Sequence, residues 1–186
     1  MAHAPDSLID FDIHHVSVEM NTNDMPSLSG LAVGSKIRGL IGSRSEPLIA
    51  TFGMAPPYAG SKPSARSTLD LKASPELLEK IMSIVSKIED HPLTPNWARN
   101  LNSPIRNDYV RIKVGKMVQV TLMEDGKIIG EGCLADLVPG SRVVACVRFD
   151  DPWELSNKDG SMMAGVSLGC EALLIEKPPP VVPMVW

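Results

Sequence analysis

The chain has 186 residues, of which 44% are apolar and 22% charged, and its formal net charge is −4. A chain of this length buries roughly 70% of the surface that its unfolded form exposes, so one domain with its own core is expected without a disulfide or structural metal. Uncharged stretches such as 25–35 and 178–186 are shorter than a membrane span and contain proline, which excludes a transmembrane helix.

The N-terminus and the cysteines indicate an intracellular protein. The first residues carry neither the basic region nor the apolar region of a secretory signal. Cys133, Cys146 and Cys170 are odd in number and lack CxxC spacing, so we expect buried thiols in a reducing compartment.

Charge is distributed unevenly along the chain. Residues 1–35 carry five acids and no lysine or arginine, residues 36–117 carry 13 bases against 7 acids, and residues 118–186 carry 5 bases against 10 acids. A protein that binds a polyanion needs cations only where Lys and Arg meet the phosphates. The central block can supply such a stripe, although its composition is also typical of an ordinary solvated surface.

The first third of the chain is predicted to contain short strands. β-Branched residues favour a strand over 11–18, and the Asn, Ser, Gly and Pro content of 21–34 favours a loop. Apolar runs at 36–41 and 48–52 predict two strands joined by a turn. Residues 53–63 follow as a proline-rich loop, of a length that often serves in binding.

One helix is predicted after an alternating strand at 67–71. Ser74 is a good N-cap, Pro75 suits the first helical position, and the apolar residues between 77 and 88 recur on one broad face. The helix is expected to end near Pro92, because the residue before a proline avoids the α region.

The remainder of the chain is predicted to be sheet. Alternation over 109–114 places Arg111 and Lys113 on one face. Asp125-Gly126 predicts a hairpin between 118–123 and 127–130, since this pair tolerates the positive φ angles of a tight turn. Further strands are expected at 142–149 and 162–175. Several strands, one helix and several strands indicate an all-β fold with one helix, arranged as an antiparallel barrel.

Enzymatic chemistry finds little support in the sequence. Motifs such as GxSxG, the Walker loop and HExxH are absent, and the adjacent His14 and His15 would point to opposite faces of a strand. The carboxylate pairs 124–125 and 150–151 lie at predicted turns, where solvation explains them. We expect no catalytic residue, no metal site and no cofactor.

Cations and aromatic residues occur together in the central block. Single-stranded nucleic acid is held by a basic groove and by aromatic faces on which bases stack. We assign Phe52 and Phe149 to the core, and expect Tyr58, on a Pro/Gly loop, and Trp153 to stack on bases. The expected phosphate contacts are Lys36, Arg38, Arg44, Lys62, Arg66, Arg111, Lys113 and Lys116.

The C-terminal segment 176–186 is proline-rich and ends in Trp186. Its composition predicts an extended arm with an aromatic tip that binds a partner. The alternative is that this arm packs on its own domain or has no fixed structure.

The layout from Lys36 to Ile175 resembles the single-stranded DNA-binding proteins of nucleocytoplasmic large DNA viruses and, more distantly, those of lytic phages. The elements that carry the likeness are the strand pair closing on 47–53, the helix from Pro75, the strand 111–114, the Asp125-Gly126 hairpin, the valine-rich strand, Trp153 and the final strand led by Gly160. The resemblance implies an OB fold, with a helix between its third and fourth strands and nucleic acid across strands 2 and 3. In the phage relatives an acidic tail with an aromatic tip covers the groove; here prolines replace the acids before Trp186.

The sequence therefore predicts an acidic segment over 1–35, an OB-fold-like domain over 36–175 and a tail over 176–186. The expected function is non-specific coating of single-stranded DNA in viral replication or recombination, without enzymatic activity. Expected partners are single-stranded DNA, replication proteins reached through the tail and further copies of the chain, at the viral replication site inside the host cell and without a membrane. The alternative is a capsid or scaffold protein with a sandwich core and extended arms.

Overall fold

The computed structural model describes residues 6–20, 26–30, 35–55, 67–92, 94–96 and 99–178. Four of the residues predicted to bind nucleic acid or a partner lie outside these ranges: Tyr58, Lys62, Arg66 and Trp186. The predictions made for them stay predictions.

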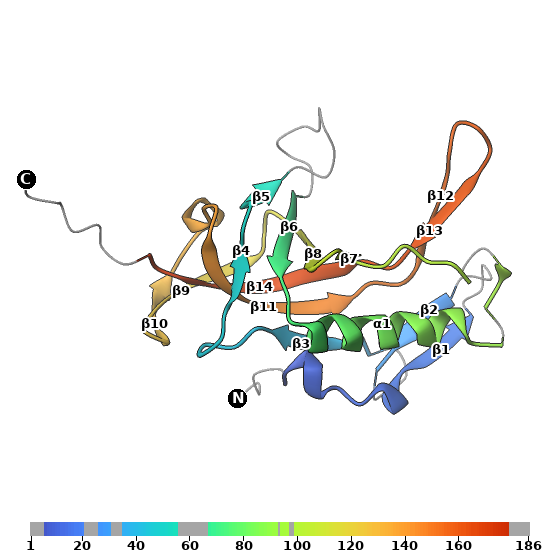
Figure 1. The fold of residues 1–186 in the computed structure, drawn as a ribbon, viewed down its shortest axis with the longest axis horizontal. Coiled ribbons are helices and arrows are strands. Elements are labelled where there is room, and N and C mark those ends of the chain that lie inside the picture. The colour runs from blue at the N-terminus through green and yellow to red at the C-terminus, as the bar shows by residue number, and fades with distance from the viewer. Residues whose placement is uncertain are drawn as a thin grey trace, which may run out of the picture.

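Five strands close into a barrel. They are β4 (Leu48–Ala50), β6 (Ser67–Lys72), β8 (Tyr109–Val114), β11 (Ser141–Phe149) and β14 (Leu168–Glu176). Each strand pairs with the next in the order β4–β6–β8–β14–β11, and β11 pairs with β4 to complete the circle. Numbered along the chain, the strand order is 1-2-3-5-4, and the pairing of the third and fifth strands is parallel. This five-stranded Greek-key barrel is the OB fold, so the predicted fold class is confirmed (Figure 1).

The first barrel strand consists of two pieces. β3 (Arg38–Ile41) and β4 do not pair with each other, because both lie along β11, one beyond the other. Between them, Gly42 adopts a positive φ of 75° in a loop that leaves the sheet. The two predicted strands are therefore present, but they form one interrupted barrel strand.

The predicted hairpin is confirmed as β9 (Gln119–Glu124) and β10 (Lys127–Glu131). Asp125 and Gly126 have φ angles of 49° and 74°, as a tight turn of this kind requires. β9 continues beyond β8 along the same side of β14. The short strands β5 (Met54–Ala55) and β7 (Ile105–Arg106) pair with β6 and β8, and a 3₁₀ turn, η4, spans Leu134–Asp136.

The strand predicted over 162–175 is divided into two. β13 (Met162–Gly165) pairs with β12 (Trp153–Ser156) in a separate hairpin that projects from the barrel, whereas β14 pairs with β11 (Figure 1). Between β13 and β14, Val166 N–H donates to the Asn102 carbonyl and Asp150 N–H donates to the Ser167 carbonyl. The chain thus changes partners at this point, a long-range effect that periodicity does not reveal.

The N-terminal segment packs against the barrel. It contains the 3₁₀ turns η1 (Leu8–Asp10) and η2 (Ile13–His15) and the paired strands β1 (Ser17–Met20) and β2 (Pro26–Ser29). Leu8 and Leu28 are buried in the same core as the barrel strands. The strand prediction for 11–18 is wrong for its first half, where the Asp12 carboxylate accepts from His14 N–H and favours a turn, and the loop predicted at 21–34 contains β2.

The helix α1 spans Pro75–Glu89 and connects the second and third barrel strands. The prediction of its start, its end and its single apolar face is confirmed, because Leu77, Ile81, Ile84, Val85 and Ile88 are buried in the core. Its place in the barrel differs from the expectation that the helix would follow the third strand. The β9–β10 hairpin occupies that connection instead.

Removing the helix N-cap is expected to destabilise the fold modestly. The Ser74 hydroxyl accepts from Leu77 N–H at 3.3 Å, so S74A should lower the free energy of unfolding by about 1 kcal/mol in urea titrations. S83A is the matched control, because the Ser83 hydroxyl donates to a carbonyl within the helix and caps no free N–H. A loss for S83A equal to that for S74A would contradict the capping role.

The cysteines differ in their surroundings. Cys170 is buried, which raises its pKa to about 12, and Cys146 is half-buried. Cys133 is exposed just before η4, so the prediction of three buried thiols is wrong for this residue.

Candidate nucleic-acid interface

The outer surface of barrel strands 2 and 3 carries a regular set of polar side chains. On β8 the residues alternate between buried and half-buried, with Val110, Ile112 and Val114 inward. The predicted common face of Arg111 and Lys113 is therefore present. β6 alternates in the same way, and the pairing sets three pairs of outward residues side by side. We call this set the β6–β8 face: Thr68, Asp70, Lys72, Tyr109, Arg111 and Lys113.

An ion pair lies at the middle of the β6–β8 face. Arg111 Nε and Nη2 each donate to one carboxylate oxygen of Asp70 at 2.8 Å, and this hydrogen bonding raises the pKa of Arg111. The two-point geometry fixes the plane of the guanidinium. Since the Arg111 side chain remains 41% exposed, its remaining N–H groups can still bind an anion from solvent.

Lys113 lies beside an aromatic ring at one end of the β6–β8 face. Its Nζ is 6.0 Å from the centroid of Trp153, at the start of β12. The indole Nε1–H donates to Ser167 Oγ at 3.1 Å, and the ring lies against the backbone of Gly165, where a Cβ would be 2.4 Å from Trp153 Cζ2. The indole ring is thus fixed in position. A base stacked on this ring would displace Lys113, whose ammonium group could then pair with the phosphate next to that base.

Two aromatic rings lie together at the other end of the β6–β8 face. Phe52 and Tyr109 have ring centroids 5.5 Å apart, and Phe52 is 63% exposed. The assignment of Phe52 to the core is therefore wrong, whereas that of Phe149, which is fully buried, is confirmed. Phe52 lies in a turn between β4 and β5, directly before Gly53 with its φ of 67°. Phe52 ends the predicted strand 48–52 and comes directly before Gly53, where the proline-rich segment begins. This position is the sequence signal that could have identified Phe52 as an exposed residue.

Both aromatic sites come from connections that flank barrel strands. Phe52 lies between the first and second barrel strands, and Trp153 between the fourth and fifth. These are the connections with which OB folds contact oligonucleotides, together with the face of strands 2 and 3. A cavity of about 110 Å³ opens between Trp153 and β8, with Arg106 of β7 at its rim.

Four other predicted cations, Lys36, Arg38, Arg44 and Lys116, are described by the structure and lie outside the β6–β8 face. Lys36 Nζ is 3.0 Å from Asp151 Oδ2, and Asp151 Oδ1 accepts from Leu28 N–H, so this pair connects β2 to the barrel. Arg38 Nε is 2.9 Å from Glu171 Oε1. Arg44 and Lys116 are exposed in turns that follow β3 and β8.

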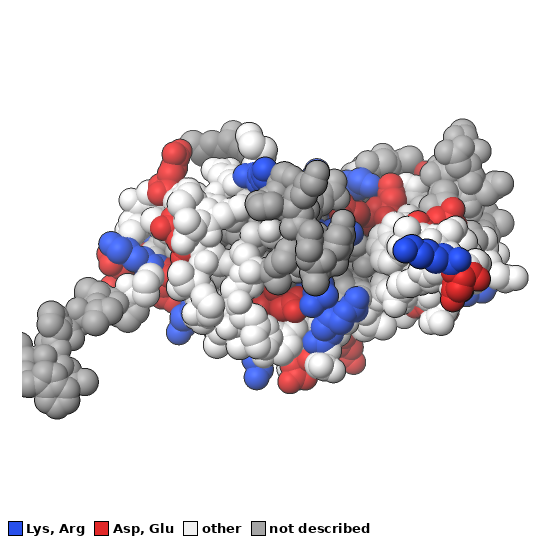
Figure 2. All heavy atoms as spheres, turned by 90° about the horizontal axis from the view of Figure 1, so that it is seen from above, with Lys and Arg blue, Asp and Glu red and all other residues white. Residues whose placement is uncertain are grey.

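Acidic side chains accompany the basic ones over much of the surface. Figure 2 shows Lys and Arg interspersed with Asp and Glu on the face seen from above, and the residues described there form no single large basic area. The charge on this face is therefore mixed, and an anion-binding site there would depend on the local arrangement of side chains.

No family model matches the chain, and no curated protein matches its sequence. Among solved structures, it is similar to gp2.5, a single-stranded DNA-binding protein of bacteriophage T7, with a TM-score of 0.47 and 14% identity over 80% of this chain and 90% of that chain. The single-stranded DNA-binding protein of bacteriophage Enc34 has a TM-score of 0.44 and 13% identity over 92% and 95% of the two chains. Its complex with single-stranded DNA has a TM-score of 0.41 and 13% identity over 89% and 97%. The fold assignment rests on the strand order of the barrel.

The part of the chain that the structure describes contains neither a candidate metal site nor a helix that could span a membrane. The described residues contain no group of three or more His, Cys, Asp and Glu side chains placed to hold a metal ion. None of their helices is both long enough and apolar enough to span a membrane.

Proposed function

We propose that this protein binds single-stranded DNA without sequence preference, across the β6–β8 face. The observation that carries the proposal is the order of groups along β8: Tyr109 with Phe52 at one end, Arg111 in the middle, and Lys113 with Trp153 at the other end. Aromatic faces separated by cations match a strand in which bases alternate with phosphates.

The geometry favours single strands over duplexes. Phe52 is a largely exposed ring, and it can stack only on a base that is not already enclosed in a duplex. From Tyr109 to Lys113 the strand advances about 13 Å, so one barrel suits a short segment, near the lower limit of about 4 nucleotides known for OB folds. Stacking and phosphate contacts accept any base, which supports the proposed lack of sequence preference.

The proposal includes a wider biological role. We propose that the protein coats single strands in viral DNA replication or recombination, without enzymatic activity, at the replication site in the host cell. The origin in large DNA viruses, the recruitment of replication proteins through the tail and the association of copies on one strand remain part of this proposal.

The alternative is a capsid or scaffold protein with a sandwich core and extended arms. The described residues form a closed barrel and not a sandwich, so we favour binding of single-stranded DNA.

The proposal is tested by titrating polythymidine of about 8 nucleotides into the protein at several salt concentrations. Four cations at the interface, Lys72, Arg106, Arg111 and Lys113, predict that log K falls with log salt with a slope of about −2 to −3. K113Q should make this slope shallower by about 0.7.

K127Q is the matched control, because Lys127 is an exposed lysine on the β9–β10 hairpin, away from the β6–β8 face. It changes the net charge by the same amount and should leave the slope as in the wild type. Affinity that does not respond to salt would show that the assignment of the interface is wrong.

A further inference from the structure

A row of cations continues from the β6–β8 face around the barrel. Lys113 on β8 is paired with Gly169 on β14, Gly169 with Arg148 on β11, and Arg148 with Arg38 on β3. The three cations come from distant parts of the chain. Because neighbouring strands lie about 4.8 Å apart, the row covers about 14 Å across the strands.

The side chains of this row are on the outside of the barrel. Lys113 and Arg148 alternate with fully buried neighbours, and Arg38 is exposed between the buried Ile37 and Gly39. Gly169 contributes no side chain. A Cβ there would lie 3.2 Å from Arg148 Nη2, so the glycine leaves room for the guanidinium over β14. A hollow of about 400 Å³ adjoins this point, lined by Lys113, Arg148 and Glu171 among others.

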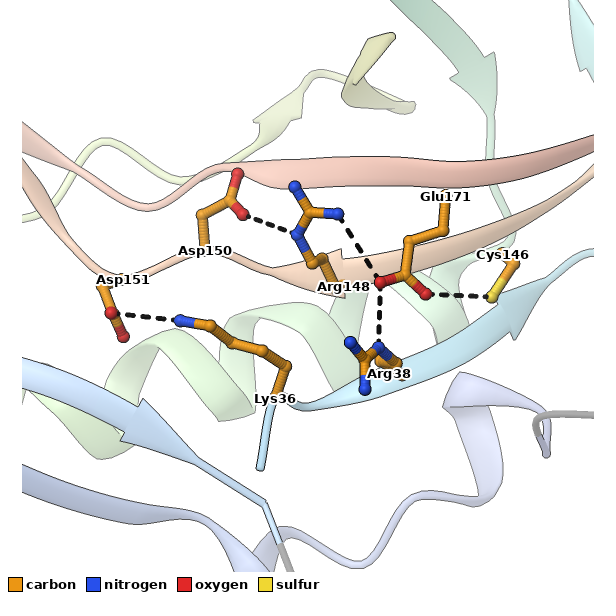
Figure 3. Close-up of polar contacts among 7 residues, drawn as sticks. All are labelled: Lys36, Arg38, Cys146, Arg148, Asp150, Asp151 and Glu171. Carbon is orange, nitrogen blue, oxygen red and sulfur yellow. Dashed lines mark hydrogen bonds and ion pairs between the residues drawn. The ribbon is translucent and has the colours of Figure 1, made fainter. Parts of the chain in front are cut away.

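One carboxylate occupies the centre of the row. Glu171 Oε1 lies 2.9 Å from Arg38 Nε and 3.5 Å from Arg148 Nη1, while Oε2 accepts a weak hydrogen bond from the Cys146 thiol (Figure 3). Arg148 Nε also donates to Asp150 at 3.1 Å. A single carboxylate oxygen therefore bridges two arginines, as a phosphate oxygen would.

The position of Glu171 depends on an irregularity of β14. The register between β11 and β14 shifts after Cys146, so that Cys146 is paired with Ala172 and Val147 with Cys170, and Glu171 has no residue directly opposite. Such a bulge re-aims a side chain. Here it directs the carboxylate between Arg38 and Arg148.

We propose that Arg38 and Arg148 form a second phosphate-binding site, continuous with the β6–β8 face, and that Glu171 occupies this site in the absence of nucleic acid. The ligand is a phosphodiester group of a strand that already lies on Lys113, so the inference rests on the proposed function. The side chains of Arg38, Arg148 and Glu171 are 51%, 39% and 26% exposed, so solvent and phosphates can reach them. Ion pairs of this exposure contribute little to stability, and an incoming phosphate can replace the carboxylate at small cost.

The experiment compares E171Q with the wild type on polythymidine of about 4 and about 12 nucleotides. We expect E171Q to bind the longer oligonucleotide about three- to tenfold more tightly. Its salt dependence should steepen by about 0.7 for each additional phosphate that the variant neutralises. Binding of the shorter oligonucleotide, which the β6–β8 face accommodates alone, should be unchanged. R38Q should weaken binding of the longer oligonucleotide only.

E176Q is the matched control. Glu176 also lies on β14 and pairs with an arginine of β11, with Arg142 Nε 2.7 Å from Glu176 Oε2 and side-chain exposures of 54% and 25%. This pair is as exposed as the Arg38–Glu171 pair but lies outside the row. E176Q should therefore bind both oligonucleotides as the wild type does.

The outcomes separate this inference from the proposed function. If K113Q weakens binding while E171Q has no effect on either length, the second site is refuted and the β6–β8 face stands. Equal tightening by E171Q and E176Q would also refute it, because net charge would then explain the tighter binding. If wild-type protein binds neither oligonucleotide, both proposals fail.

Discussion

Charge reversal on the β6–β8 face, in the variant R111E/K113E, is expected to weaken binding of single-stranded DNA about 100-fold or more at low salt. Lys72, Arg106, Arg111 and Lys113 set against Asp70 give this region a net charge of +3, and the two substitutions change it to −1. Phosphates would then meet net repulsion where they now displace counterions. Fluorescence titration with polythymidine measures the loss.

The same variant raises a question of folding, since a glutamate at position 111 would face Asp70 across the strand pair. Like charges in directly opposed positions destabilise a sheet by up to about 1 kcal/mol. D70N/R111E/K113E removes this repulsion and should unfold in urea close to the wild-type midpoint while still binding poorly. Recovery of wild-type affinity in the triple variant would contradict a direct role of Arg111 and Lys113 in binding.

Loss of the exposed ring at Phe52 is expected to have the second-largest effect on binding. Stacking of one base on an aromatic side chain contributes about 1–3 kcal/mol, so F52A should weaken binding roughly five- to 150-fold. The slope of affinity against salt should not change, because no cation is removed. Phe52 is a cleaner target than Trp153, whose indole also holds Ser167 and lies against Gly165.

Two variants test whether the effect at Phe52 comes from stacking. F52W retains an aromatic face and should bind at least as tightly as the wild type, whereas F52L retains only apolar bulk and should resemble F52A. I128A removes an apolar side chain of similar exposure, 53%, from β10 and should leave binding unchanged. Wild-type affinity in F52L would mean that general apolar contact, and not base stacking, explains the role of Phe52.

Local chemistry made several elements predictable. The helix begins at Ser74 and Pro75 because these residues satisfy the first turn, and the Asp125-Gly126 turn forms because both residues tolerate positive φ angles. The alternation of Arg111 and Lys113 with buried valine and isoleucine defined which face of β8 meets solvent. Each of these features depends on neighbours within a few residues.

The partners of the charged groups were not predictable. Arg38 and Glu171 are 133 residues apart, and Arg111 and Asp70 are 41 residues apart. The sequence showed a basic central block, but the pairing of strands brings acidic side chains from that block and from the C-terminal part among the cations. The surface therefore carries both positive and negative side chains. Of the residues predicted to bind phosphate, Arg38 and Arg111 already form ion pairs with acidic side chains, whereas Arg44 is exposed in a turn.

By itself the sequence determined the periodicity of strands, the limits of the helix, the tight turn and a barrel-like order of elements, since these follow from backbone preferences and the burial of apolar side chains. Only the tertiary structure decided that β3 and β4 form one interrupted strand and that Phe52 faces solvent beside Tyr109. It also decided the position of Glu171, which Gly169 and a bulge in β14 place between two arginines. These features depend on strand register and barrel closure, which are determined by the packing of residues far apart in the chain.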